Sequence, residues 1–159
     1  MANCDDRLLA LEDRAAIAAL IASYGPLADS GDANGVARLW TDDGTYTVGG
    51  FGTATGHAEI AALIEGPTHQ ELMRAGCAHV LSPHVITLNG DSATATGYSL
   101  VLRNEAGAFE TWRVSANAWE FLRTENGWLV QHRDNAPLNG SDAARALLRT
   151  SAPEGNGTA

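Results

Sequence analysis

Apolar and polar residues alternate along most of the chain after residue 76, and turn sequences interrupt the alternation at intervals. A period of two residues is typical of strands that bury one face. The pattern predicts four consecutive strands, over Cys77–Leu88, Ser92–Arg103, Phe109–Arg123 and Trp128–Asn135. The first turn contains Asn89-Gly90, which suits the positive φ angles of a type I′ hairpin. This run of strands therefore predicts an antiparallel sheet.

The residues before the predicted sheet have helical periodicity instead. Apolar residues spaced by three and four predict helices over 6–28, 33–41, 56–65 and 68–74, with a short strand at Thr45–Val48 and a last helix over 141–149. Helices segregated from a run of strands favour an α+β fold over a parallel α/β sheet. We expect an α+β fold in which the N-terminal helices pack in the concave face of a curved, mainly antiparallel sheet.

Length and composition indicate one globular domain. The 159 residues are 45% hydrophobic, which is enough to build a core. We expect a single domain over residues 1–150 and a flexible tail over residues 151–159, whose composition is small and polar. The net charge of −9, from 19 acidic and 10 basic residues, disfavours nucleic acids and anionic membranes as partners, because both require a basic surface.

The sequence predicts a cytoplasmic location by default. The N-terminal residues lack the basic and apolar regions of a signal peptide, and no segment has the ~20 apolar residues that span a bilayer. Two cysteines, Cys4 and Cys77, are too few for a disulfide framework or a cysteine-rich zinc site. No pair of histidines or acids has the spacing of a zinc helix, so we expect no metal and no other cofactor.

Asp29 stands where a strongly apolar helix ends, in the stretch YGPLADSGD. A carboxylate there meets the negative end of the helix dipole, so its position needs a reason. One reason is that Asp29, Ser30 or Asp32 caps the next helix. The other is that Asp29 points back into the domain and has a partner elsewhere. A kink at Pro26 would bring Tyr24 toward the same cavity, although Tyr24 also fits a place in the core.

His79 is the candidate partner of Asp29. It alternates with Leu81 in the first predicted strand, so it would share the core-facing side and be shielded from water. Such a histidine suits a base, although a hydrogen-bonded core histidine fits the same pattern. His84 is expected on the opposite face of that strand. The roles of the remaining histidines stay open: His57, His69 and His132.

The predicted strand Phe109–Arg123 has two faces of different character. One mixes polar groups with aromatic rings and contains Arg113, Ser115, Asn117, Trp119 and Phe121. The other is mostly apolar and contains Trp112, Val114, Ala116, Ala118 and Glu120. The first face is predicted to line a small-molecule pocket, unless it faces solvent or a dimer partner. The second face leaves apolar surface to cover, which predicts a homo-oligomer, either a dimer or a trimer.

Several segments together resemble the SnoaL-like branch of the NTF2-like superfamily. These segments are the helix end at Tyr24 to Asp32, ARLWTDDGTYTV, CAHVLSPHVITLNGDSATATGYS and SANAWEFLRTENGWLVQHR. The resemblance covers the chain from Leu8 to Leu138 and implies a cone-shaped α+β fold. Within that superfamily the bile acid 7α-dehydratases, scytalone dehydratase and lindane dehydrochlorinase are enzymes in which an aspartate and a histidine face each other inside the cone.

The resemblance also implies residue roles. Asp29 and His79 match the acid and the histidine, and Tyr24 matches the tyrosine of the bile acid enzymes. Ser115 and Asn117 resemble the polar pair that scytalone dehydratase directs at its substrate, and Arg113 falls where the dehydrochlorinase has an arginine. The chain has no obvious counterpart of the second active-site histidine of scytalone dehydratase, and Tyr24 replaces the lysine of the dehydrochlorinase. The residues thus match a mixture of relatives, so no substrate follows from them.

The implied function is that of a cofactor-independent lyase. In this interpretation Asp29, His79 and Tyr24 carry out a dehydratase-like elimination on a hydrophobic cyclic or aromatic small molecule. The expected substrate-binding residues are Arg113, Ser115, Asn117 and Trp119. The same base also suits an isomerase, a polyketide cyclase or a carbon-carbon lyase. A non-catalytic module that binds a small molecule is the remaining alternative.

Overall fold

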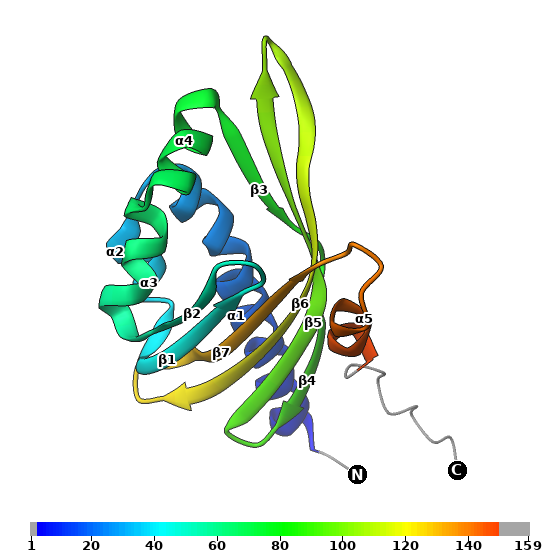
Figure 1. Cartoon of the computed structure of the whole chain (residues 1–159). Coiled ribbons are helices and arrows are strands. Elements are labelled where there is room, and N and C mark those ends of the chain that lie inside the picture. The colour runs from blue at the N-terminus through cyan, green and yellow to red at the C-terminus, as the bar shows by residue number, and fades with distance from the viewer. Residues whose placement is uncertain (1–2, 150–159) are drawn as a thin grey trace.

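The computed structural model of the protein describes residues 3–149 and has an α+β architecture (Figure 1). Its helices are α1 (Cys4–Asp29), α2 (Ala33–Ala37), α3 (Gly56–Glu65), α4 (Pro67–Ala75) and α5 (Asp142–Arg149). Its strands are β1 (Trp40–Val48), β2 (Gly52–Thr55), β3 (Cys77–Leu81), β4 (Val85–Asn89), β5 (Ser92–Glu105), β6 (Ala108–Thr124) and β7 (Gly127–Pro137). The predicted fold class is confirmed, whereas the predicted tail over 151–159 lies outside the described residues. None of the helices within residues 3–149 combines the length and the apolar composition needed to cross a bilayer.

Within residues 3–149 the strands form one mixed sheet of seven strands. The strand order is β2-β1-β7-β6-β5-β3, and β4 pairs with the other end of β5. β1 and β7 run parallel, and all other neighbours run antiparallel. Helices α1 to α4 lie on the concave side of the sheet, and α5 lies against the opposite side (Figure 1). The space between the concave face and the first four helices is where a cavity can form.

The predicted strand Cys77–Leu88 is two strands in the structure. β3 and β4 both pair with β5, and the segment around Pro83 separates them. Proline has no N–H to contribute to a sheet ladder, so the ladder stops there and the alternation of faces is lost. His84 therefore turns inward and accepts a hydrogen bond from Trp119 of the inner face. The expectation that His84 lies on the face opposite to His79 is wrong for this reason.

Two further differences concern the segment between α1 and α3. The helix predicted over 33–41 ends at Ala37, because Trp40 begins β1 and pairs with Val130 of β7. β2 was not predicted; it is a four-residue strand that begins with glycine and is held by pairing with β1. Both differences arise from pairing with distant strands, which local composition does not encode.

Gly25 lets α1 approach the backbone of β3. A β-carbon at Gly25 would lie 2.2 Å from the carbonyl oxygen of His79, far inside van der Waals contact. Only glycine permits this approach. The helix continues through Pro26 and ends at Asp29, one turn after Gly25, so Asp29 lies on the side of α1 that faces β3.

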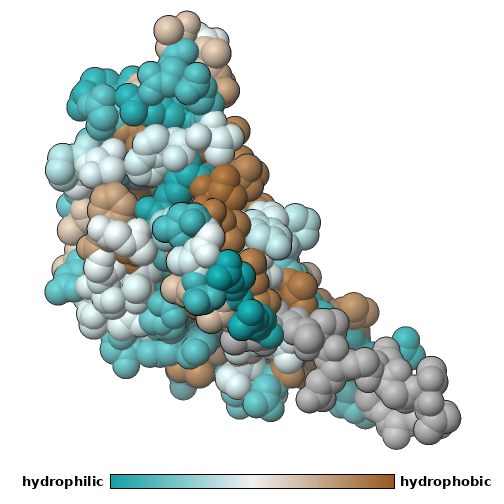
Figure 2. All heavy atoms as spheres, turned by 45° about the vertical axis from the view of Figure 1, so that its right-hand side comes forward, coloured by the Kyte–Doolittle hydropathy of each residue, from teal (hydrophilic) through white to brown (hydrophobic). Residues whose placement is uncertain are grey.

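The convex side of the sheet is partly covered by α5. This helix packs on β6, and both Ala116 of β6 and Ala144 of α5 are fully buried. Val114 remains 37% exposed. Figure 2, in which this side of the sheet comes forward, shows apolar side chains gathered among hydrophilic ones. The apolar outer face is therefore smaller than the sequence suggested, because Ala116 already has a partner. The homo-oligomer that would cover the remainder stays a prediction.

Gly25→Ala is expected to lower the free energy of unfolding by roughly 1–3 kcal/mol, because the added methyl group forces α1 away from β3. Urea denaturation followed by circular dichroism measures the change. Ser23→Ala is the control on the same helix, since it removes only a hydroxyl that bonds the Ala19 carbonyl. Equal stability of Gly25→Ala and the control would contradict the assigned role of Gly25.

Candidate functional site

A cavity of about 120 Å³ lies between the concave face of the sheet and helices α1, α3 and α4. Its polar lining includes two tyrosines, two histidines and two arginines: Tyr24, Tyr46, His69, His79, Arg113 and Arg133. Apolar residues from α3, α4 and the strands complete the wall, among them Leu63, Leu72, Leu81, Val101 and Trp112. An apolar cavity with a few converging polar groups is typical of a small-molecule site.

Asp29 and His79 form a hydrogen-bonded pair at one side of this cavity. His79 Nδ1 lies 2.6 Å from Asp29 Oδ1, and the His79 backbone N–H donates to Asp29 Oδ2 at 2.8 Å. A carboxylate only accepts, so Nδ1 carries a proton, and Nε2 is the nitrogen that can hold a lone pair toward the cavity. Burial alone would raise the pKa of Asp29, but the hydrogen bonds from His79 outweigh it and hold that pKa below its usual range. Asp29 therefore stays ionised at neutral pH.

The capping role considered for Asp29 belongs to Asp32. The Asp32 side chain accepts from the backbone N–H of Gly35 at 2.7 Å and caps α2. The Ser30 hydroxyl donates instead to the carbonyl of Leu27, within the last turn of α1. Both Asp29 oxygens are thus available to His79, which explains the position of an acid at this helix end.

Tyr24 lies in the same interior and is 6% exposed. Its ring centroid is 6.3 Å from that of His79 and 6.1 Å from that of Tyr46, in edge-to-face arrangements. Burial strongly raises the pKa of the Tyr24 hydroxyl, and the neighbouring Tyr46 adds to the shift, whereas Arg133 opposes it. Tyr24 therefore keeps its proton at any ordinary pH and can act as a hydrogen-bond donor.

The polar residues predicted on β6 all face the interior, but they do not all reach the cavity. Arg113 lines it, whereas Ser115, Asn117 and Trp119 are at most 1% exposed and are not among its lining residues. Ser115 accepts from Arg113 Nε at 3.0 Å. Asn117 Oδ1 accepts from Nε and Nη2 of Arg133 at 3.1 and 2.8 Å. In this structure Ser115 and Asn117 thus hold arginine side chains that line the cavity.

Arg133 is a lining residue that sequence reasoning missed. Simple alternation from the buried Trp128 and Val130 would turn His132 inward and Arg133 outward. A register shift places Val130 opposite Phe121 and His132 opposite Glu120, so Gln131 is an extra residue in the ladder. Such a bulge reverses the alternation. Arg133 is consequently 1% exposed, and the alternation of the sequence gave no signal for it.

A second bulge changes the orientation of Trp112. Val101 pairs with Arg113 and Leu102 with Thr111, which leaves Trp112 as the unpaired residue. Trp112 therefore lines the cavity together with Arg113, although alternation placed the two on opposite faces. The assignment of Trp112 to the outer face is wrong in this respect, while its ring still remains partly exposed.

His69 of α4 also lines the cavity, although the sequence left its role open. Its Nε2 lies 2.8 Å from the carbonyl oxygen of Ala28, which can only accept, so Nε2 carries the proton. Nδ1 then has a lone pair, for which residues 3–149 provide no hydrogen-bond donor. The ring centroids of His69 and His79 are 5.2 Å apart. Burial lowers the pKa of His69 and the nearby His79 acts in the same direction. The sequence does contain a signal for the inward orientation of His69. His69 lies three residues before Leu72, which puts both side chains on the buried face of α4.

Comparison with known proteins agrees with this architecture. A family model described as a SnoaL-like domain matches residues 9–134. The chain belongs to the SnoaL-like domain family. None of the curated proteins matches it significantly. An NTF2-like protein with a cystatin-like fold from Novosphingobium aromaticivorans is similar in structure, with 55% sequence identity and a TM-score of 0.90 over 94% of this chain and 99% of that one.

More distant structures share the fold with this SnoaL-like domain. ActVI-ORFA from Streptomyces coelicolor has 24% identity and a TM-score of 0.69, over 77% of this chain and 95% of that one. A protein of unknown function from Mycobacterium tuberculosis has 19% identity and a TM-score of 0.73, over 96% of this chain and 94% of that one. At these identities the likeness shows the fold alone.

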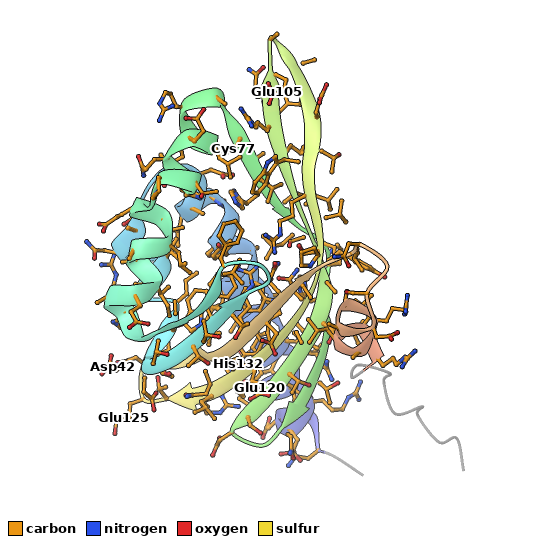
Figure 3. The ribbon with its side chains drawn as sticks, in the orientation of Figure 1. Asp42, Cys77, Glu105, Glu120, Glu125 and His132 are labelled. Carbon is orange, nitrogen blue, oxygen red and sulfur yellow. The ribbon has the colours of Figure 1, made fainter. Side chains whose placement is uncertain are left out.

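Cys77 is at the start of β3 (Figure 3). It contacts Asp29 of the Asp29–His79 pair of the SnoaL-like domain. Its thiol donates to Asp29 Oδ1 at 3.4 Å. Ligand atoms of Asp29, Cys77 and His79 lie within 4.8 Å of one another, and this is the group among residues 3–149 that could hold a metal ion. Both Asp29 oxygens accept hydrogen bonds from His79, and burial with the nearby carboxylate raises the pKa of Cys77 to about 11. This arrangement favours hydrogen bonding over metal ligation, which needs a thiolate.

The remaining histidines of the SnoaL-like domain have structural partners. His57 Nε2 lies 2.9 Å from the carbonyl of Trp40. His132 is bonded to Thr45 and, through Nε2, lies 3.1 Å from Asp134. Neither His57 nor His132 lines the cavity.

His84 is held neutral between two fixed partners. Its Nδ1 is 2.7 Å from the carbonyl of Ser82 and its Nε2 accepts from Trp119 Nε1 at 3.1 Å. One partner only accepts and the other only donates, so a second ring proton has no acceptor. Burial lowers the pKa of His84 to about 4.

The stability of the SnoaL-like domain should therefore depend on His84 at acidic pH. The unfolded chain binds a proton below about pH 6.5, whereas the folded chain does so only below about pH 4. The contribution of neutral His84 to the free energy of unfolding is complete above pH 6.5. It falls by up to roughly 3 kcal/mol as the pH decreases toward 4. His84→Gln, which keeps a donor and an acceptor, should show a shallower loss over this interval in urea denaturation. A difference between the two proteins that does not change with pH would contradict the prediction.

Proposed function

We propose that this SnoaL-like protein is a cofactor-independent lyase that carries out a dehydratase-like elimination on a hydrophobic cyclic or aromatic small molecule. The observation that carries the proposal is the 2.6 Å contact between His79 Nδ1 and Asp29 Oδ1 beside an aromatic-lined cavity. A carboxylate that fixes one tautomer of a histidine and leaves the other nitrogen free is a general-base arrangement.

His79 is the base in this mechanism. Nε2 removes a proton from a carbon of the substrate, and Asp29 stabilises the imidazolium that results. The electrons of the broken C–H bond form the new double bond as a neighbouring hydroxyl departs. The imidazolium then returns the proton to that hydroxyl, so water leaves and His79 regains its starting state.

Three groups around the pair would assist this step. The Tyr24 hydroxyl, which stays protonated, can donate to a substrate oxygen. Arg113 carries a positive charge that stabilises negative charge on an enolate or on the leaving oxygen. Burial lowers the pKa of His69 and so favours its neutral form, whose Nδ1 can accept a hydrogen bond from a substrate hydroxyl. Together they would orient the carbon acid over His79 Nε2.

The same base also serves isomerisation, cyclisation or carbon-carbon cleavage, and the products distinguish these reactions. Elimination releases water, isomerisation and cyclisation keep the mass unchanged, and cleavage gives two smaller products. Mass spectrometry of mixtures with ring alcohols and ketones in deuterated water therefore serves as the assay. It detects both the mass change and the exchange of the abstracted proton.

Asp29→Asn and His79→Gln are expected to lower the turnover and the exchange of deuterium by at least about 10³-fold, because each removes part of the base. Circular dichroism should show that both variants keep the fold. His132→Gln is the matched control, since His132 also contacts a carboxylate but lies outside the cavity. Full activity in either site variant, or no loss of water from any compound in the wild type, would refute the proposal and favour a binding module.

A further inference from the structure

The charge of the cavity lining is opposite to that of the protein. The chain has a net charge of −9. The cavity residues within the described part of the chain nevertheless include Arg113 and Arg133 and no aspartate or glutamate. Asp29 lies behind His79 and is not a lining residue. An anion that is repelled by the surface of this protein would meet positive potential in the cavity.

Arg133 is a buried cation without a counterion. It is 1% exposed, and no carboxylate within residues 3–149 lies within 4.0 Å of it. Its guanidinium lies over the rings of Tyr24, Tyr46 and Trp119 at 4.2, 4.5 and 4.1 Å. These rings stabilise the charge through their faces but carry no negative charge to neutralise it. Nη1 is buried and has no hydrogen-bond partner. An unpaired buried charge of this kind is costly unless a ligand completes the site.

Arg113 is joined to Arg133 by neutral groups alone. Its Nη2 donates to Asn135 Oδ1 at 2.8 Å, and Asn135 Nδ2 donates to Asn117 Oδ1 at 3.0 Å. Asn117 Oδ1 also accepts from Arg133. Arg113 Nη1 donates to no group among the described residues. Burial lowers the pKa of Arg113, and the charge of Arg133 acts in the same direction. An anion between the two guanidinium groups would therefore stabilise both positive charges.

We propose that the cavity takes a ring compound with an anionic oxygen group, a carboxylate in the simplest case, and that Arg113 and Arg133 supply the charge that holds it. The 120 Å³ cavity accommodates one aromatic ring against Trp112 and the leucines of its wall. The carboxylate takes the place of the missing counterion, with charge-assisted hydrogen bonds from the guanidinium groups. The inference names the substrate class of the proposed function and rests on that function for its chemistry, although binding itself requires no turnover.

Benzoate and benzamide provide the test, because they share a ring and differ in charge. Their binding is followed by the indole NMR signal of Trp112, assigned with Trp112→Phe. Wild-type protein is expected to bind benzoate at least about tenfold more tightly than benzamide. Arg113→Gln should reduce this preference to about threefold or less. Arg145→Gln is the matched control and should keep it, since Arg145 is exposed on α5, on the other side of the sheet.

Asp29→Asn separates this inference from the proposed reaction. It should bind benzoate with the wild-type preference and show no turnover. If the wild type prefers benzoate but neither it nor any variant shows turnover, the inference about binding stands and the proposed lyase function is refuted. Turnover of neutral ring compounds, without preferential binding of benzoate, would support the lyase function and overturn the inference about binding. Equal affinity for the two ligands in the wild type, or an undiminished preference in Arg113→Gln, would overturn the inference.

Discussion

The contact between α1 and β3 at Gly25 is the constraint on which the candidate site depends. The missing side chain lets the His79 carbonyl lie against the helix, and one turn later the helix ends at Asp29. The Asp29 carboxylate then accepts both the backbone N–H and the ring N–H of His79. Two bonds from one residue fix the position of the carboxylate and the orientation of the imidazole together. Two residues that lie 50 positions apart in the sequence, one on a helix and one on a strand, are thereby joined in one hydrogen-bonded pair.

The cationic side of the cavity is organised by a different kind of contact. Amide and hydroxyl groups on the inner face of the sheet hold the two arginines, and none of them neutralises the charge. Aromatic rings surround Arg133 where a carboxylate would usually be found. The cavity thus combines a histidine held by a carboxylate, which favours proton removal, with cations, which favour negative charge on oxygen. Both are requirements for proton abstraction from carbon.

Sequence reasoning succeeded where the pattern stayed regular. The long strands, the hairpin turns and the α3 and α4 helices follow from hydrophobic periodicity, and Asp29 stood out because an acid rarely ends an apolar helix without a partner. The reasoning failed where the sheet departs from alternation. The bulges at Trp112 and Gln131 and the break at Pro83 each reverse the face of the following side chains. Arg133, Trp112 and His84 were therefore misplaced or overlooked, and all three errors have one physical cause.

Local periodicity and composition are enough to predict the α+β class and the polar residues that face inward from β6. The tertiary structure decided which of those groups meet. Only strand register brings Arg133 beside Tyr24, and only the packing of α4 over the sheet sets His69 next to His79. Bulges and helix packing are settled by contacts between residues that are distant in the sequence, so the pattern along the chain does not contain them.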